Sequence, residues 1–192
     1  MTEPKWAILI LAGGRSRRMG RDKTGILFEG KPLLRHLVDR LGTEPWTLFV
    51  AGGAQDHVLP TLPDEVLVFP DPEEDQGPLA AFAGFAPKAP AFDRVLVLAC
   101  DLPHFAKPHA QTLLRRSGTP IPGEGARAWV PVAAGRRQVL AGVYTPEAFA
   151  VAARLFDRGE RSLQRFLDAI EFELLPQEQE KAFLNWNRPG DL

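Results

Sequence analysis

The sequence predicts a single α/β domain built on a doubly wound, mostly parallel sheet. Short runs that are apolar on both faces recur along the first half of the chain, and this is the pattern of strands buried in a parallel sheet. Segments of helix length separate these runs, an alternation typical of βαβ units. With 192 residues, the chain is long enough for one well-buried core and short for two ordinary domains.

The elements of the first half follow from apolar runs and helix signals. The first run, residues 6–11, is apolar at every position and is the clearest buried strand. A helix is expected to begin at Pro32, a favourable first-turn residue, and to end before Gly42. The remaining expected elements are strands at 47–51, 66–69 and 94–100 and helices at 79–85 and 108–116.

The pattern loosens after residue 118, where a small β-hairpin excursion is expected from segments 128–132 and 138–144. Thr145, Pro146 and Glu147 then provide an N-cap, a first-turn proline and an early acid, so a helix should begin there. We expect the chain to finish with a helix at 162–169 and two short strands at 171–175 and 182–186.

The composition favours a soluble globular protein, with 45% hydrophobic and 24% charged residues. A net charge of -1 gives no reason to expect nucleic acid or a membrane as partner. Cys100 is the only cysteine, which excludes a disulfide within the chain and fits a reducing compartment. The N-terminus does not resemble a secretory signal and no apolar stretch is long enough to span a bilayer, so we expect a cytoplasmic protein.

A glycine- and arginine-rich loop follows the first strand, and residues 11–23 read LAGGRSRRMGRDK. The adjacent glycines at 13 and 14 let backbone amides approach a ligand that any Cβ would obstruct. Open α/β sheets bind ligands at the carboxyl ends of their strands, where this loop should lie. The loop holds one acid, Asp22, and five cations: Arg15, Arg17, Arg18, Arg21 and Lys23. In a nearly neutral protein, this local charge predicts a polyanionic ligand.

Two common phosphate loops are excluded. A P-loop needs glycine directly before Lys-Ser/Thr, whereas Gly20 is followed by Arg-Asp-Lys. The dinucleotide fingerprint Gly-x-Gly-x-x-Gly is absent from the segment. The alternative interpretation, a solvated arginine-rich turn, leaves the paired glycines and their place after a strand unexplained.

Two aspartates follow predicted strands. Asp101 stands directly after strand 94–100, where a carboxylate is well placed for Mg²⁺ that bridges phosphate oxygens. The alternative is that Asp101 caps the following turn. Asp71 lies between Pro70 and Pro72, and the residues alone favour a turn residue and a ligand contact about equally.

The two asparagines of the chain, Asn185 and Asn187, flank Trp186. In the strand expected at 182–186, alternate residues share a face, so both amides would point the same way. The alternative is a strand end with turn-forming asparagines. The four histidines show no metal-ligand spacing, and His36 is expected on a helix surface.

The loop resembles the signature of the molybdenum cofactor guanylyltransferases (MobA-type), within the sugar-nucleotide-type nucleotidyltransferase superfamily. The residues that carry the resemblance are Leu11-Ala-Gly-Gly and, after three positions, Arg18-Met-Gly-x-Asp-Lys23. Cys100-Asp-Leu-Pro103 matches the family's Cys-Asp-x-Pro, and residues 183–192 match its closing Phe-x-Asn-x-Asn-x-Pro-x-Asp-Leu. Gly159-Glu-Arg-Ser-Leu163 is similar to Gly-x-Arg-Ser-Leu, so the resemblance covers residues 6–192. Ala81, where the family often has glycine, and Ala51-Gly-Gly53, where some relatives have asparagine, depart from it.

The resemblance implies a Rossmann-like nucleotidyltransferase fold over residues 1–192, with a nucleotide-binding half at about 6–117 and an acceptor-binding half at about 118–192. It implies Mg²⁺-dependent transfer of GMP from GTP to the phosphate of molybdopterin, with release of pyrophosphate. The expected catalytic residues are Arg18, Lys23 and Asp101, with Asp101 as the metal ligand. Nucleotide contacts are expected from Leu11, Ala12, Gly13, Lys23, Asp71 and Asp101, and acceptor contacts from Asn185 and Asn187.

Two other functions remain open at this point. A sister enzyme could transfer a cytidylyl group or use a phosphosugar as acceptor, although the second glycine and the Asp-Lys pair favour the guanylyl branch. A non-catalytic GTP-binding module could instead deliver the cofactor to an apoenzyme. Besides GTP and molybdopterin, transient contact with molybdoenzyme maturation proteins is expected, and nucleic acid and membranes are not.

Overall fold

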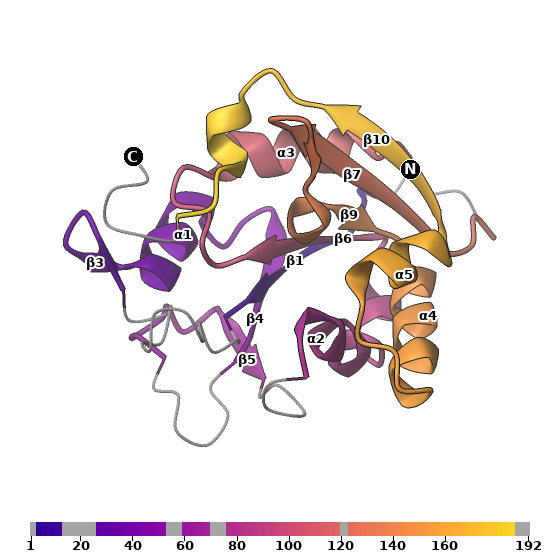
Figure 1. The fold of residues 1–192 in the computed structure, drawn as a ribbon. Helices are drawn as coiled ribbons and strands as arrows, with labels where there is room; N and C mark the ends of the chain where they lie inside the picture. The colour runs from indigo at the N-terminus through magenta and orange to yellow at the C-terminus, as the bar shows by residue number, and fades with distance from the viewer. Residues whose placement is uncertain (1–2, 13–25, 53–58, 70–75, 120–122, 187–192) are drawn as a thin grey trace.

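The computed structural model describes residues 3–12, 26–52, 59–69, 76–119 and 123–186, and its centre is one twisted sheet (Figure 1). The described strands of this sheet follow the order β10-β7-β9-β6-β1-β4-β5, with β8 paired to β7. Those that point in one direction are β1 (Trp6–Leu11), β4 (Trp46–Ala51), β5 (Leu67–Phe69), β6 (Arg94–Ala99), β7 (Arg127–Ala133) and β10 (Glu171–Pro176). The antiparallel ones are β8 (Arg136–Arg137) and β9 (Val143–Tyr144). The doubly wound, mostly parallel sheet is thus confirmed.

Helices cover both faces of the sheet (Figure 1). They are α1 (Leu33–Leu41), α2 (Pro78–Phe85), α3 (Lys107–Arg116), α4 (Pro146–Asp157) and α5 (Leu163–Asp168), with 3₁₀ turns η2 (Ala89–Ala91), η3 (Val139–Ala141) and η4 (Glu180–Phe183). A separate pair, β2 (Leu27–Phe28) and β3 (Lys31–Pro32), precedes α1. In the described part of the chain, no helix has the length and apolar character that crossing a membrane requires.

The alternating residues of β1 explain why the first strand is apolar throughout. Ile8 and Ile10 belong to the core beneath α1 and α3, whereas Ala7 and Leu9 belong to the core beneath α2 and α4. Each of these four side chains is 0% exposed. A strand between two helical layers must be apolar on both faces, and this is the pattern by which the sequence revealed it.

Two sequence expectations in the second half need correction. β7 pairs antiparallel with β9, as the expected hairpin requires, but segment 138–144 is not one continuous strand. The turn η3 interrupts it, because the Gln138 N–H donates to the Pro131 carbonyl at 2.8 Å and the Val97 N–H donates to the Gly142 carbonyl at 2.9 Å.

The second correction concerns Thr145, whose side chain does not cap α4 as expected. Its hydroxyl instead donates to the Gly125 carbonyl at 2.8 Å and accepts from the Arg127 N–H at 2.9 Å.

The last expected strand, at 182–186, is also wrong. Residues 180–183 form η4, and an extended segment without strand pairing follows. Two consecutive residues, Ala182 and Phe183, are buried, and the Phe183 ring packs edge-on against Phe105 with centroids 5.7 Å apart. A strand would send these neighbours to opposite faces, whereas a 3₁₀ turn buries both. The argument that Asn185 and Asn187 share a strand face therefore no longer holds.

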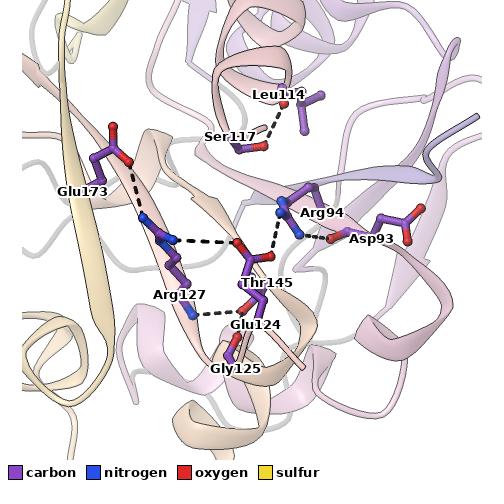
Figure 2. Close-up of polar contacts among 9 residues, drawn as sticks. All are labelled: Asp93, Arg94, Leu114, Ser117, Glu124, Gly125, Arg127, Thr145 and Glu173. Carbon is purple, nitrogen blue, oxygen red and sulfur yellow. Dashed lines mark hydrogen bonds and ion pairs between the residues drawn. The ribbon is translucent and has the colours of Figure 1, made fainter. Parts of the chain in front are cut away.

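A polar cluster lies at the amino ends of β6 and β7 (Figure 2). Arg94, 2% exposed, pairs with Glu124 through Nη2 and Oε2 at 2.7 Å, and the guanidinium carbon lies 4.7 Å from the centre of the Trp129 ring. Arg127 Nη1 lies 3.9 Å from the other Glu124 oxygen, and its Nη2 lies 3.5 Å from Glu173 on β10. The cluster therefore connects β6 with β7 and β10 at the amino ends of these strands, the edge opposite the candidate site described below.

Candidate active site

The carboxyl ends of β1, β4 and β6 form the base of the candidate site. In the parallel register Leu11 is opposite both Ala51 and Ala99, so the three strands end level with one another. Beyond them the Ala12 N–H donates to the Ala51 carbonyl at 2.8 Å, and the Cys100 N–H donates to the Leu11 carbonyl at 3.2 Å. Leu11 and Ala12, which precede the glycine-rich loop in the chain, are therefore held to the neighbouring strands by backbone hydrogen bonds.

Leu11 and Ala12 lie at this edge, as the sequence predicted, and each is 7% exposed. Because the Ala12 N–H is already bonded to Ala51, its carbonyl and methyl groups are what it can offer to a ligand. The other expected residues of the nucleotide site, Gly13, Arg18, Lys23 and Asp71, lie outside the described residues, as does Asn187.

Asp101 is positioned by the turn that follows β6. It is 5% exposed, and its backbone carbonyl accepts the N–H of Trp186 at 2.9 Å. This bond places Asn185, an exposed residue, one position away from a direct partner of Asp101. The structure thus brings Leu11, Ala12, Asp101 and the Asn185 segment to one edge of the sheet.

Helix α1 holds the turn that carries Asp101. His36 Nε2 donates to the Pro103 carbonyl at 3.1 Å, and Arg40 Nε donates to the Phe105 carbonyl at 3.2 Å. The expectation that His36 lies on a helix surface is wrong, because it is 8% exposed. A signal was available: His36 stands three residues after Leu33, at the margin of the apolar stripe of α1.

A second turn at this edge precedes α2. Gly77 has φ 80°, a conformation that favours glycine, and α2 begins at Pro78. Arg161 Nε donates to the Gln76 side-chain oxygen at 2.7 Å, and the Arg161 guanidinium stacks 3.9 Å above the Phe156 ring. The Gly-x-Arg-Ser-Leu segment therefore supports the Gln76–Gly77 turn. Sequence reasoning matched this motif but missed the contact, because periodicity carries no information on residues 85 positions apart.

Two further residues belong to the same region: Glu160, next to Arg161, and Ala81, in α2. Backbone N–H groups of Ser162 and Arg161, at 2.8 and 2.9 Å from Glu160 Oε1, hold the pKa of Glu160 below its ordinary value. Ala81, the departure from the family's glycine, is 2% exposed and packs in the core beneath α2 and α4. Its methyl group therefore fills the core.

His104 makes the stability of the folded protein depend on pH. Burial, followed by the charges of Lys181 and Arg40, holds the pKa of His104 below 6.5. The folded protein thus favours neutral His104, while the unfolded chain takes up a proton as the pH falls through 6.5. The contribution to stability is complete above that pH and is lost as the pH falls from there toward the folded-state pKa.

We therefore expect the urea midpoint of the wild type to fall more steeply than that of His104→Gln between about pH 7.5 and pH 5.5. Glutamine stays neutral over this range, so it removes the titration and keeps a side chain of similar length. Parallel midpoint curves for the two proteins would contradict the assignment to His104.

Comparison with known proteins identifies the family. A family model described as "MobA-like NTP transferase domain" matches residues 8–175. A probable molybdenum cofactor guanylyltransferase from Synechococcus elongatus is 32% identical over 188 residues, which cover 97% of this chain and 95% of the relative. A protein of the same description from Opitutus terrae is 35% identical over 193 residues, 95% of this chain and 90% of that one.

A solved structure agrees on the fold. Molybdopterin-guanine dinucleotide biosynthesis protein A from Archaeoglobus fulgidus aligns with a TM-score of 0.74 at 19% identity, covering 96% of this chain and 94% of that one. The resemblance based on the glycine-rich loop, Cys100–Pro103 and the C-terminal motif is thereby confirmed. The chain belongs to the MobA-like NTP transferase family and is a nucleotidyltransferase.

Proposed function

We propose that this enzyme transfers GMP from GTP to the phosphate of molybdopterin and releases pyrophosphate. The observation that carries the proposal is the hydrogen bond from the Trp186 N–H to the Asp101 carbonyl, at 2.9 Å. It joins the segment expected to hold the acceptor to the residue expected to hold the metal. The relatives described as molybdenum cofactor guanylyltransferases support the choice of GTP and molybdopterin.

The triphosphate would lie against the loop that begins beyond Ala12. In the proposed arrangement, Leu11, Ala12, Gly13 and Asp71 contact the nucleotide. Because the Ala12 N–H is bonded to Ala51, the phosphates would be bound by Gly13 and the loop beyond it. Arg18 and Lys23 draw negative charge from the α-phosphate and from the leaving pyrophosphate. Fixed positive charge at the position where negative charge develops lowers the barrier of such a transfer.

Asp101 would hold Mg²⁺. A carboxylate at the carboxyl edge, one strand away from the start of the triphosphate loop, is the hard oxygen ligand that Mg²⁺ prefers, and phosphate oxygens and water supply the rest. When bound, the ion would neutralise charge on the triphosphate. The protein's own part is to keep Asp101 in place through the bonds from His36 and Trp186 that hold its turn.

The acceptor needs orientation more than activation. Its phosphate has a second pKa of about 6 and is ionised near neutral pH, so no dedicated base is required. We propose that Asn185 and Asn187 orient it toward the α-phosphate, which makes catalysis mainly a matter of alignment and charge neutralisation.

The protein would work in the cytoplasm, and transient contact with molybdoenzyme maturation proteins remains an expectation from the sequence.

Pyrophosphate release from each of the four ribonucleoside triphosphates, with Mg²⁺ and with or without molybdopterin, tests the proposal. We expect GTP with molybdopterin to exceed CTP by at least about 10²-fold in kcat/KM, because a site built to hydrogen-bond one base leaves polar groups unpaired with another. A preference for CTP would indicate the sister cytidylyltransferase. Tight GTP binding without pyrophosphate release would indicate a non-catalytic delivery module.

A further inference from the structure

Trp186 is buried at the end of an exposed segment. It is 8% exposed, whereas Leu184 is 47% exposed and Asn185 is also exposed. Its backbone N–H donates to Asp101, as described above. A large aromatic side chain buried in this way anchors its segment to the surface on which it packs.

The surface beneath Trp186 is Phe28, in β2. The two rings meet edge to face, with centroids 5.6 Å apart and planes at 80°. Phe28 is 4% exposed and clusters with Leu33 and Ile26, and the Leu33 N–H donates to the Ile26 carbonyl at 2.9 Å. Trp186 therefore packs on the strand that follows the glycine-rich loop in the chain.

The same Phe28 ring also contacts the turn that carries Asp101. Its centroid lies 5.8 Å from that of His104, at 87°, and 4.8 Å from that of His36, at 67°. His36 in turn donates to the Pro103 carbonyl. One buried ring thus contacts the C-terminal segment, the Asp101 turn and the helix that supports this turn.

We infer that Trp186 is a positioning residue that, seated on Phe28, fixes the distance between Asn185 and Asp101. The inference rests on the proposed function, in which these two residues serve the acceptor and the metal. Transfer requires the acceptor phosphate and the α-phosphate to be aligned, and a displacement of about 1 Å can cost about 10²-fold in rate.

The indole acts through its shape. Its Nε1 is buried, and no hydrogen-bond acceptor reaches it among the described residues. Phenylalanine at this position would keep an aromatic ring on Phe28 and would remove the buried N–H together with part of the ring volume. Alanine would remove the ring and release the segment.

Kinetics of Trp186→Ala and Trp186→Phe test the inference. We expect Trp186→Ala to lower kcat/KM for molybdopterin at least about tenfold, while the Kd for GTP with Mg²⁺ changes by less than about threefold. GTP binding should be kept because β2 is held independently, by its pairing with β3 and by the Leu33–Ile26 bond. Trp186→Phe should stay within about threefold of the wild type in both measurements. Leu184→Ala, in the same exposed segment, is the matched control and should not change either value.

Amide hydrogen exchange gives a readout that does not depend on turnover. The backbone amide of residue 186 should exchange faster in Trp186→Ala and in Phe28→Leu than in the wild type. Its exchange rate should be unchanged in Trp186→Phe and Leu184→Ala. If Trp186→Ala does not fold, Trp186→Leu takes its place in both experiments.

Three results would overturn the inference: full activity of a folded Trp186→Ala, equal impairment of Trp186→Phe, or an equal loss of GTP affinity. Failure of the wild type to use molybdopterin would refute the proposed function, and the exchange rates would still decide whether Trp186 holds the segment against Asp101.

Discussion

Replacing Asp101 with asparagine should lower the rate of pyrophosphate release by about 10³-fold or more and leave the protein folded. Asparagine has the same shape and keeps the backbone carbonyl that accepts the Trp186 N–H, so the turn should retain its geometry. What it lacks is the negative charge that would hold Mg²⁺ against the triphosphate. Initial rates at saturating GTP and molybdopterin, measured over a range of Mg²⁺ concentrations, give the result.

Asp93 provides the matched control, because it lies just before the opposite end of the same strand, β6. Its carboxylate accepts the Lys5 N–H at 2.7 Å, and Asp93→Asn should retain transfer. We expect Lys23→Ala to abolish transfer for a different reason, the loss of positive charge from the glycine-rich loop. Turnover like that of the wild type in Asp101→Asn would remove Asp101 from the mechanism.

The second large effect concerns stability. Glu124→Gln should lower the free energy of unfolding by about 3–5 kcal/mol, because it leaves the buried charge of Arg94 without its counterion (Figure 2). The side chains of Arg94 and Glu124 are 2% and 9% exposed, so water cannot take over the lost interaction. Urea unfolding with an unchanged m-value would measure the loss.

Glu173→Gln is the control for this experiment. Its carboxylate pairs with Arg127 at 3.5 Å, but the two side chains are 52% and 34% exposed, so the change should cost less than about 1 kcal/mol. The double variant Arg94→Met with Glu124→Leu should recover most of the stability, because it removes both buried charges together. Equal losses in Glu124→Gln and Glu173→Gln would show that burial does not govern this pair.

The sequence was informative where a local pattern decides the structure. Strand 6–11 was predicted at its observed bounds because a strand between two helical layers must be apolar on both faces. Asp101 was assigned to the carboxyl edge because parallel strands carry their ligand-binding loops there, and the register of β1 with β6 confirms that position.

The sequence was uninformative where contacts between segments far apart in the chain determine the structure. The turn η4 replaces the expected strand because Ala182 and Phe183 both enter the core. His36 is buried with its ring against Phe28 and bonded to the Pro103 carbonyl. The contacts of Arg161 with Gln76 and of Trp186 with Phe28 have no periodic signature. The roles of Arg18, Lys23, Asp71 and Asn187 stay predictions, because these residues lie outside the described ones.

The reversed strand β9 has a consequence for how this architecture can change. Because β9 runs antiparallel to both β6 and β7, those two strands share a direction, and β10 is parallel to β7. The connections that leave β7 and β10 thus open on the same rim as those that leave β1 and β6. If the acceptor binds there as proposed, new lengths or sequences in the connections after β7 and β10 would change the acceptor contacts without altering any strand.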